Sequence, residues 1–157
     1  MIPIVKAKTP EATQALNTFL KKEGEKAHYT NFKQSDGKDA VQKSLLEEQG
    51  YLCAYCMRRI HEAEKIEHWA TQEASKDNEN AHETLDYNNM LAVCNGKTKD
   101  GTKSGQAHCD QSRSKSNRAL TINPIDPIGI NQIRHLKNGT IYSKDNAIND
   151  DLNLDNS

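Results

Sequence analysis

Aromatic residues, net charge and long hydrophobic runs are all scarce in this sequence of 157 residues. Aromatic side chains make up 5% and hydrophobic residues 34%, so we expect a modest core that a structural metal ion would help to stabilise. The formal net charge is −1, so any affinity for nucleic acid must come from a local basic cluster. No apolar stretch approaches the roughly 20 residues of a membrane-spanning helix, and we expect no membrane partner.

A secretory signal is also missing from the sequence. The apolar run at the N-terminus is short and soon reaches Lys6, unlike a signal peptide. We therefore expect a cytoplasmic protein, in which cysteines are more typical of metal ligands than of disulfides. The length suits one domain, and the sequence leaves open whether the chain continues past its C-terminus.

Apolar periodicity and capping signals predict two helices near the N-terminus. Thr9 is typical of a helix cap, and a helix is predicted from about residue 11 to 22. A second helix is predicted from about residue 38 to 49, with Gly50 at its C-terminal cap. The polar stretch between the two helices is predicted to be a loop.

The remainder of the chain predicts short strands and turns. Residues 51–60 are typical of two strands around a tight turn, and residues 65–69 of another strand. Asp86 is predicted to cap a helix that begins near Tyr87. Residues 132–143 predict a hairpin about an Asn-Gly turn.

The four cysteines are the clearest chemical signal. Cys53 and Cys56 form a C-x2-C pair, whose tight turn aims two sulfurs at one ion, and Cys94 and Cys109 would complete a zinc site. The second pair spans 109 − 94 = 15 positions, so the loop between must fold back, and His108 is an alternative fourth ligand. Buried free cysteines are the plain alternative. A dithiol redox site is less expected, because such sites sit at a helix start in a βαβ unit.

Between and beside the cysteines lie side chains suited to phosphodiester hydrolysis. His68 is a candidate general base, since a neutral imidazole has a pKa near operating pH. Glu67, Asn89 and Asp110 offer oxygen ligands that suit Mg²⁺ or Mn²⁺. Taken singly, His68 is more often a packed strand residue, Asn89 a helix-start residue and Glu67 a solvated carboxylate.

Together these residues resemble the HNH, or ββα-metal, endonucleases. In that family a Cys pair precedes a strand carrying an acidic residue and His, and an Asn lies five positions before the next Cys. A His or Asn follows the last Cys, where this chain has Asp110. The resemblance implies an α+β fold with a ββα-metal core, His68 as the base and Glu67 and Asp110 as catalytic metal ligands. It implies that Asn89 either orients the base or holds the metal.

One branch of the family is more similar, the PtuB-type nucleases of Septu and related retron anti-phage systems. The similar runs are LLEEQGYLCAYC (45–56), IEHW (66–69), YNNMLAVCN (87–95) and HCD (108–110). The resemblance spans about residues 40–126 and implies a PtuA-like ATPase partner and DNA as substrate. It divides the chain into an N-terminal helical segment (1–50), a nuclease core with a C-terminal hairpin (51–143) and a polar tail (144–157). That tail is expected to be disordered, partner-binding or the start of a further helix.

A basic cluster follows the last cysteines. Between residues 97 and 118 there are six basic and two acidic residues, a balance of 6 − 2 = +4. Such charges position a nucleic-acid backbone without specifying its sequence, although a solvated loop is the plain alternative. The candidate DNA-contacting residues are Arg58, Arg59, Arg113, Lys115 and Arg118.

The leading hypothesis is therefore a metal-dependent HNH endonuclease with a structural zinc ion and a catalytic Mg²⁺ or Mn²⁺. A non-catalytic zinc-knuckle adaptor that binds a partner protein or nucleic acid is the alternative from another class. An RNase on the same scaffold differs from the leading hypothesis only in its substrate.

Overall fold

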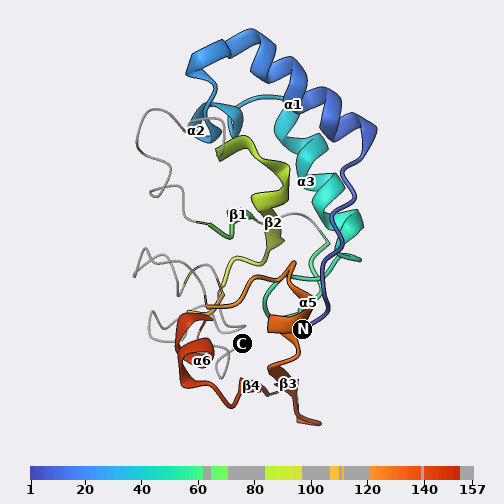
Figure 1. Ribbon diagram of the computed structural model, residues 1–157. Coiled ribbons are helices and arrows are strands. Elements are labelled where there is room, and N and C mark those ends of the chain that lie inside the picture. Colours follow the sequence, from blue (N-terminus) through green and yellow to red (C-terminus); the bar gives the residue numbers. More distant parts are fainter. Residues whose placement is uncertain are drawn as a thin grey trace.

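The computed structural model describes residues 1–61, 65–70, 84–96, 107–109, 111, 121–138 and 140–152. The fold is mixed α+β, as expected from the sequence, and the described residues form two small antiparallel sheets. Figure 1 shows helices α1 and α3 at one end, strands β1 and β2 in the middle and the C-terminal elements at the other end. Among the residues that the structure describes, no helix is long and apolar enough to cross a bilayer.

The two predicted N-terminal helices are confirmed. Helix α1 (Pro10–Glu23) begins after Thr9, whose side chain accepts a hydrogen bond from the N–H of Ala12. Helix α3 (Gly37–Glu48) packs against α1 and is followed by Gly50, whose φ of +61° suits glycine. The N–H of Gly50 reaches the carbonyl of Glu47, and the next N–H reaches back to Leu46. This paired closure of the last turn is a Schellman motif.

The prediction of a loop between these helices was wrong for residues 24–26 and 29–32. A 3₁₀ turn, η1 (Gly24–Lys26), is followed by the short helix α2 (Tyr29–Phe32). Tyr29 and Phe32 are buried, and the Phe32 ring meets Phe19 of α1 edge-on at 5.2 Å. A four-residue helix shows no periodicity in sequence, so only tertiary packing of its two aromatic rings reveals it.

The central sheet pairs β1 (Lys65–His68) with β2 (Met90–Val93) in antiparallel register, with His68 opposite Met90. Strand β1 was predicted, but the helix predicted from Tyr87 was wrong. Only the single 3₁₀ turn η3 (Tyr87–Asn89), capped by Asp86, precedes β2. All four residues of β2 are buried, and a short continuous apolar run cannot be distinguished from a buried helix by periodicity.

The outer edge of β2 is completed by a side chain. The Gln49 amide donates to the carbonyl of Ala92 at 2.8 Å and accepts from the Ala92 N–H at 2.8 Å. The N–H of Ala54 donates to the same carbonyl. The main-chain groups of Ala92, which a strand edge would leave without partners, are therefore hydrogen-bonded by Gln49 at the end of α3 and by Ala54 in the C-x2-C turn.

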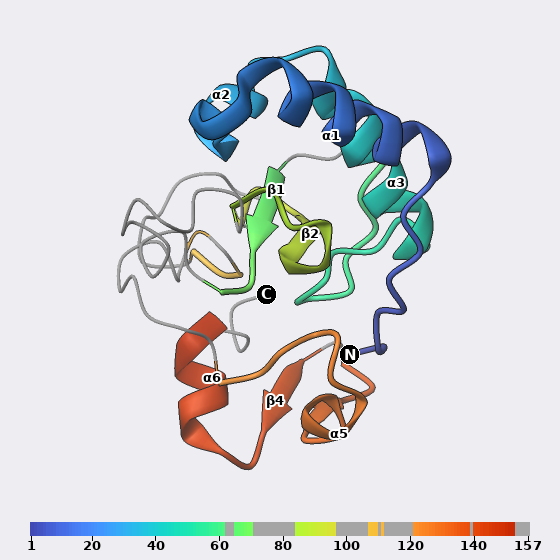
Figure 2. The same cartoon turned by 45° about the horizontal axis from the view of Figure 1, so that its top comes forward.

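The C-terminal elements form a second small unit of structure. Helix α5 (Pro127–Ile130), capped by Asp126, precedes the predicted hairpin, in which β3 (Ile133–His135) pairs with β4 (Ile141–Ser143). Part of the polar tail forms helix α6 (Asn146–Leu152), which contacts β4. Of the three expectations for the tail, the further helix is therefore confirmed for these residues. Figure 2 shows α6, β4 and α5 grouped on one side of the central sheet.

The N-terminal segment ties these parts together. The N–H of Ile4 donates to the carbonyl of Pro124, and the Lys6 ammonium donates to the carbonyl of Met90 at 2.7 Å. Lys6 also pairs with the buried carboxylate of Glu48, whose other oxygen accepts from Ala7 N–H. Burial lowers the pKa of Lys6, although Glu48 opposes that effect. One continuous apolar core runs from α1 through the sheet to the C-terminal hairpin.

Candidate functional site

The four cysteine sulfurs converge on one point. All four Sγ atoms lie within 4.8 Å of one another, with Cys53 to Cys109 at 4.0 Å and Cys56 to Cys94 at 3.9 Å. A zinc ion with Zn–S distances of about 2.3 Å at a tetrahedron's centre requires sulfur separations of about 3.8 Å. All four residues are buried and none is in a disulfide. The donor set and its spacing therefore fit a tetrahedral four-thiolate metal site.

The first cysteine turn is held by main-chain hydrogen bonds. The N–H of Met57 donates to the carbonyl of Cys53, and the N–H of Cys53 donates to the carbonyl of Arg58. The two strands predicted on either side of the turn are reduced to a single antiparallel bridge between Leu52 and Arg59. The N–H of Cys94 points at the Cys53 sulfur at 3.4 Å, which links the first turn to the end of β2.

The second half of the cluster is closed by Gly96 and His108. The N–H of His108 donates to the carbonyl of Gly96, so the two ends of the long insertion meet. Cys109 follows with a φ of +54°, a left-handed conformation that non-glycine residues rarely adopt. Cys109 belongs to the sulfur cluster, while the His108 Nδ1 lies 3.1 Å from the Cys109 sulfur. Of the two expected fourth ligands, Cys109 is thus in the ligand position and His108 is beside it.

The electrostatics of the cluster also fit a cation. Hydrogen bonding with Cys109 lowers the pKa of the Cys94 thiol and that of the Cys53 thiol. Hydrogen bonding with Cys53 raises the pKa of Cys109 itself. Only some of four crowded thiols can ionise without a positive charge between them, whereas a divalent ion stabilises all of them as thiolates.

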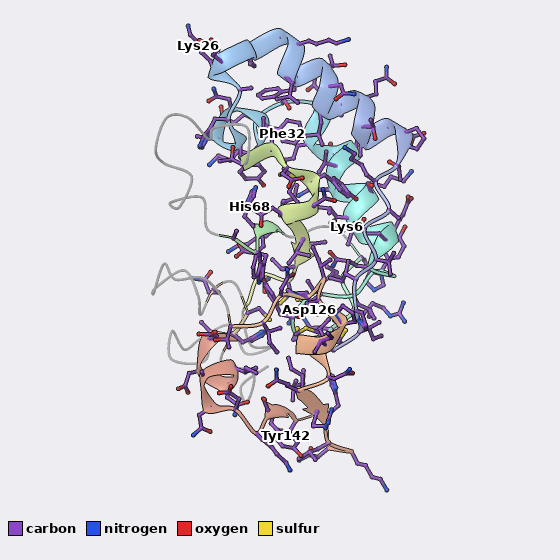
Figure 3. All side chains as sticks on the ribbon, in the orientation of Figure 1. Lys6, Lys26, Phe32, His68, Asp126 and Tyr142 are labelled. Carbon is purple, nitrogen blue, oxygen red and sulfur yellow. The ribbon has the colours of Figure 1, made fainter. Side chains whose placement is uncertain are left out.

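His68 lies at the end of β1 and is only 3% exposed. Its Nε2 is 2.8 Å from the main-chain carbonyl of Thr84. The Tyr29 ring of α2 meets the imidazole edge-on, with ring centroids 4.5 Å apart and planes at 77°. Figure 3 shows His68 on β1 in the middle of the molecule, on the side where Phe32 of α2 lies. The imidazole is therefore held from two directions.

Asn89 holds the backbone that follows His68. Its Oδ1 accepts from the N–H of Ala70 at 2.7 Å, and its Nδ2 donates to the carbonyl of the same residue at 3.1 Å. The carbonyl of Asn89 accepts from the N–H of Trp69. Three hydrogen bonds thus continue the pairing of β1 and β2 beyond the last strand residue.

The expected ligands of a second ion are only partly placed. Glu67 is half-buried on β1 opposite Leu91, next to His68 in the chain, and its charge helps to raise the pKa of Tyr29. Asp110 lies outside the described residues. Within the ranges that the structure covers, the four cysteines are the one group of three or more His, Cys, Asp or Glu side chains close enough to share a metal.

Of the candidate DNA-contacting residues, two can be placed. Arg58 is half-buried and donates to the Asn95 side chain at 3.4 Å, and Arg59 is exposed at the edge of the first cysteine turn. Arg113, Lys115 and Arg118, like most of the basic cluster between residues 97 and 118, lie outside the described residues.

Two residues that contact His68 are not predicted by any pattern in the sequence. Tyr29 and Thr84 both contact His68, from positions 39 residues before it and 16 after it. Neither belongs to a recognisable pattern. A buried aromatic pair in an otherwise polar stretch, Tyr29 and Phe32, was the one available signal.

No protein-family model matches the sequence, and no curated protein matches it.

Gly96 provides a test of the closed metal site. A Cβ at Gly96 would lie 2.4 Å from the Cβ of Gln111 and 2.4 Å from the His108 carbonyl oxygen, whereas a Cβ at Gly50 would meet nothing within 4 Å. Both glycines have positive φ, so alanine costs about 1–2 kcal/mol at either position. We expect Gly96→Ala to cost about 1–3 kcal/mol more, because of the clash.

The measurement is chemical denaturation of the zinc-loaded protein, together with zinc competition against a chelator. Gly50→Ala is the matched control and is expected to leave zinc affinity unchanged, while Gly96→Ala lowers it. Equal effects of the two substitutions on stability and zinc affinity would contradict the closure of the site by Gly96.

Proposed function

We propose that this protein is a metal-dependent HNH-type endonuclease that hydrolyses DNA phosphodiester bonds. The observation that carries the proposal is that one short sheet joins the four-sulfur cluster to the candidate base. Strand β2 (Met90–Val93) lies between Asn89 and Cys94, and it pairs along its length with β1, which ends at His68. A metal at the cysteines would therefore hold the backbone that presents the imidazole.

The hydrogen bond at His68 supports Nδ1 as the nitrogen that would act as the base. A carbonyl oxygen only accepts, so the Nε2 facing Thr84 carries the proton. In the neutral imidazole the lone pair then belongs to Nδ1, which takes a proton from water as that water attacks phosphorus. The bond from phosphorus to the 3′-oxygen breaks as the new P–O bond forms.

The zinc ion of this proposal has a structural role. Four thiolates fill a tetrahedral site and leave no open position for water or substrate. A separate Mg²⁺ or Mn²⁺, held by Glu67 and Asp110, would supply the charge that stabilises the leaving oxygen. Asn89 then acts by orienting the chain beside His68, since its Oδ1 and Nδ2 both bind Ala70.

Two further observations support DNA as the substrate and a role in anti-phage defence. Arg58 and Arg59, with Arg113, Lys115 and Arg118, supply positive charge for phosphate contacts. The resemblance to PtuB-type nucleases motivates a role as the nuclease subunit of an anti-phage defence complex with a PtuA-like ATPase.

A zinc-knuckle adaptor remains the second candidate, because one observation favours it. His68 is buried and hydrogen-bonded, and both polar atoms of the Asn89 side chain bind main-chain groups, as in a purely structural sheet. An adaptor that binds a partner protein or nucleic acid needs the same frame and no base.

His68→Ala tests the base. We expect plasmid cleavage in the presence of Mg²⁺ or Mn²⁺ to fall by about 10²–10⁴-fold, the usual contribution of a general base. His61→Ala is the matched control, because His61 is exposed and lies outside the sheet. Circular dichroism and zinc content of both variants check that the fold persists. Cleavage by His68→Ala at the wild-type rate would refute the assignment of His68 as the base. If the wild-type protein cleaves RNA but not DNA, the substrate is RNA instead.

Asn89→Asp separates the two expected roles of Asn89. Aspartate keeps an oxygen that can bind a metal and accept from the Ala70 N–H, but it loses the donor to the Ala70 carbonyl. If Asn89 orients the chain, we expect cleavage to fall about tenfold or more without rescue by excess metal, as in Asn89→Ala. Retained cleavage with tighter Mg²⁺ or Mn²⁺ dependence would instead make Asn89 a metal ligand.

A further inference from the structure

Helix α2 supplies an aromatic wall to the imidazole of His68. Tyr29 is the first residue of this helix, and its ring meets the imidazole edge-on at 4.5 Å. The helix precedes the first cysteine by more than twenty positions and lies outside the segment that resembles HNH nucleases. A residue from the N-terminal region therefore contacts the candidate base directly.

Thr84 connects the same helix to the same histidine. Its side-chain oxygen accepts a hydrogen bond from the N–H of Tyr29 at 3.1 Å, while its carbonyl accepts from the Nε2 of His68 at 2.8 Å. The Tyr29 N–H lies at the start of α2, where a helix leaves its own N–H groups without an internal acceptor. Thr84 is 1% exposed, so this bridge is shielded from water.

We infer that Tyr29 and Thr84 are positioning residues that fix the rotamer and tautomer of His68. The inference rests on the proposed role of His68 as a base. The Thr84 hydroxyl, anchored by α2, sets where the Thr84 carbonyl points, and that carbonyl keeps the proton on Nε2. The Tyr29 ring occupies one side of the imidazole and prevents its rotation away from the carbonyl.

The chemistry of Tyr29 agrees with packing rather than proton transfer. Burial, with a further contribution from Glu67, raises the pKa of Tyr29 to about 12, so the phenol stays neutral at physiological pH. The contact is then one between a neutral phenol ring and the imidazole, at a distance typical of edge-to-face pairs.

Two pairs of variants test this inference. Thr84→Val keeps the shape but removes the acceptor for the Tyr29 N–H, and Thr84→Ser restores it. Tyr29→Leu removes the ring, and Tyr29→Phe keeps it. Ring ¹⁵N shifts of His68, assigned by comparison with His68→Gln, report the tautomer in zinc-loaded protein without any need for cleavage. Plasmid cleavage supplies kcat and KM over a range of pH.

We expect Thr84→Val and Tyr29→Leu to move the ¹⁵N shifts toward a mixture of tautomers and to lower kcat about ten- to a hundredfold at similar KM. Thr84→Ser and Tyr29→Phe should match the wild-type protein. Wild-type ¹⁵N shifts in both Thr84→Val and Tyr29→Leu would overturn the inference, even if the variants were less stable. Wild-type protein that cleaves nothing would refute the nuclease proposal alone, because the ¹⁵N shifts still decide the positioning role.

Discussion

Four buried sulfurs within 4.8 Å of one another form the constraint on which the rest of this structure depends. They come from three separate segments: the turn after α3, the end of β2, and the far side of a long insertion. Four thiolates at this spacing repel one another, and a cation at their centre would stabilise all four. Because the sequence contains few hydrophobic side chains, such an ion would contribute a larger share of the stability of the fold.

The position of the candidate base follows from that constraint. Asn89 directly precedes β2 and Cys94 directly follows it, while His68 is the last residue of the paired strand β1 and lies opposite Met90. The Asn89 side chain extends the pairing by binding the main chain of Ala70. The Thr84 carbonyl, which precedes η3 in the chain, binds the imidazole of His68. The sulfur cluster and the histidine thus lie at the two ends of one small sheet, whose main-chain hydrogen bonds fix their relative positions.

The sequence predicted those features of the fold that depend only on residues close together in the chain. The Thr9 cap, the Gly50 turn, the hairpin of β3 and β4 and the C-x2-C turn each depend on a few neighbouring residues, and all are present. Strand β2 could not be predicted, since its apolar run fits a helix equally well until β1 and Gln49 pair with it. The contacts of Tyr29 and Thr84 with His68 join distant segments, so only the folded chain reveals them.

Metal analysis of the purified protein, combined with cobalt substitution, tests whether the four cysteine sulfurs hold a structural zinc ion. We expect one zinc ion per chain, a Co²⁺ form with the charge-transfer and d–d absorption of tetrahedral four-thiolate coordination, and loss of tertiary structure around β1 and β2 on chelation. A chain that binds no metal stoichiometrically, or that keeps the same sheet and the same His68 environment after complete chelation, would contradict this expectation.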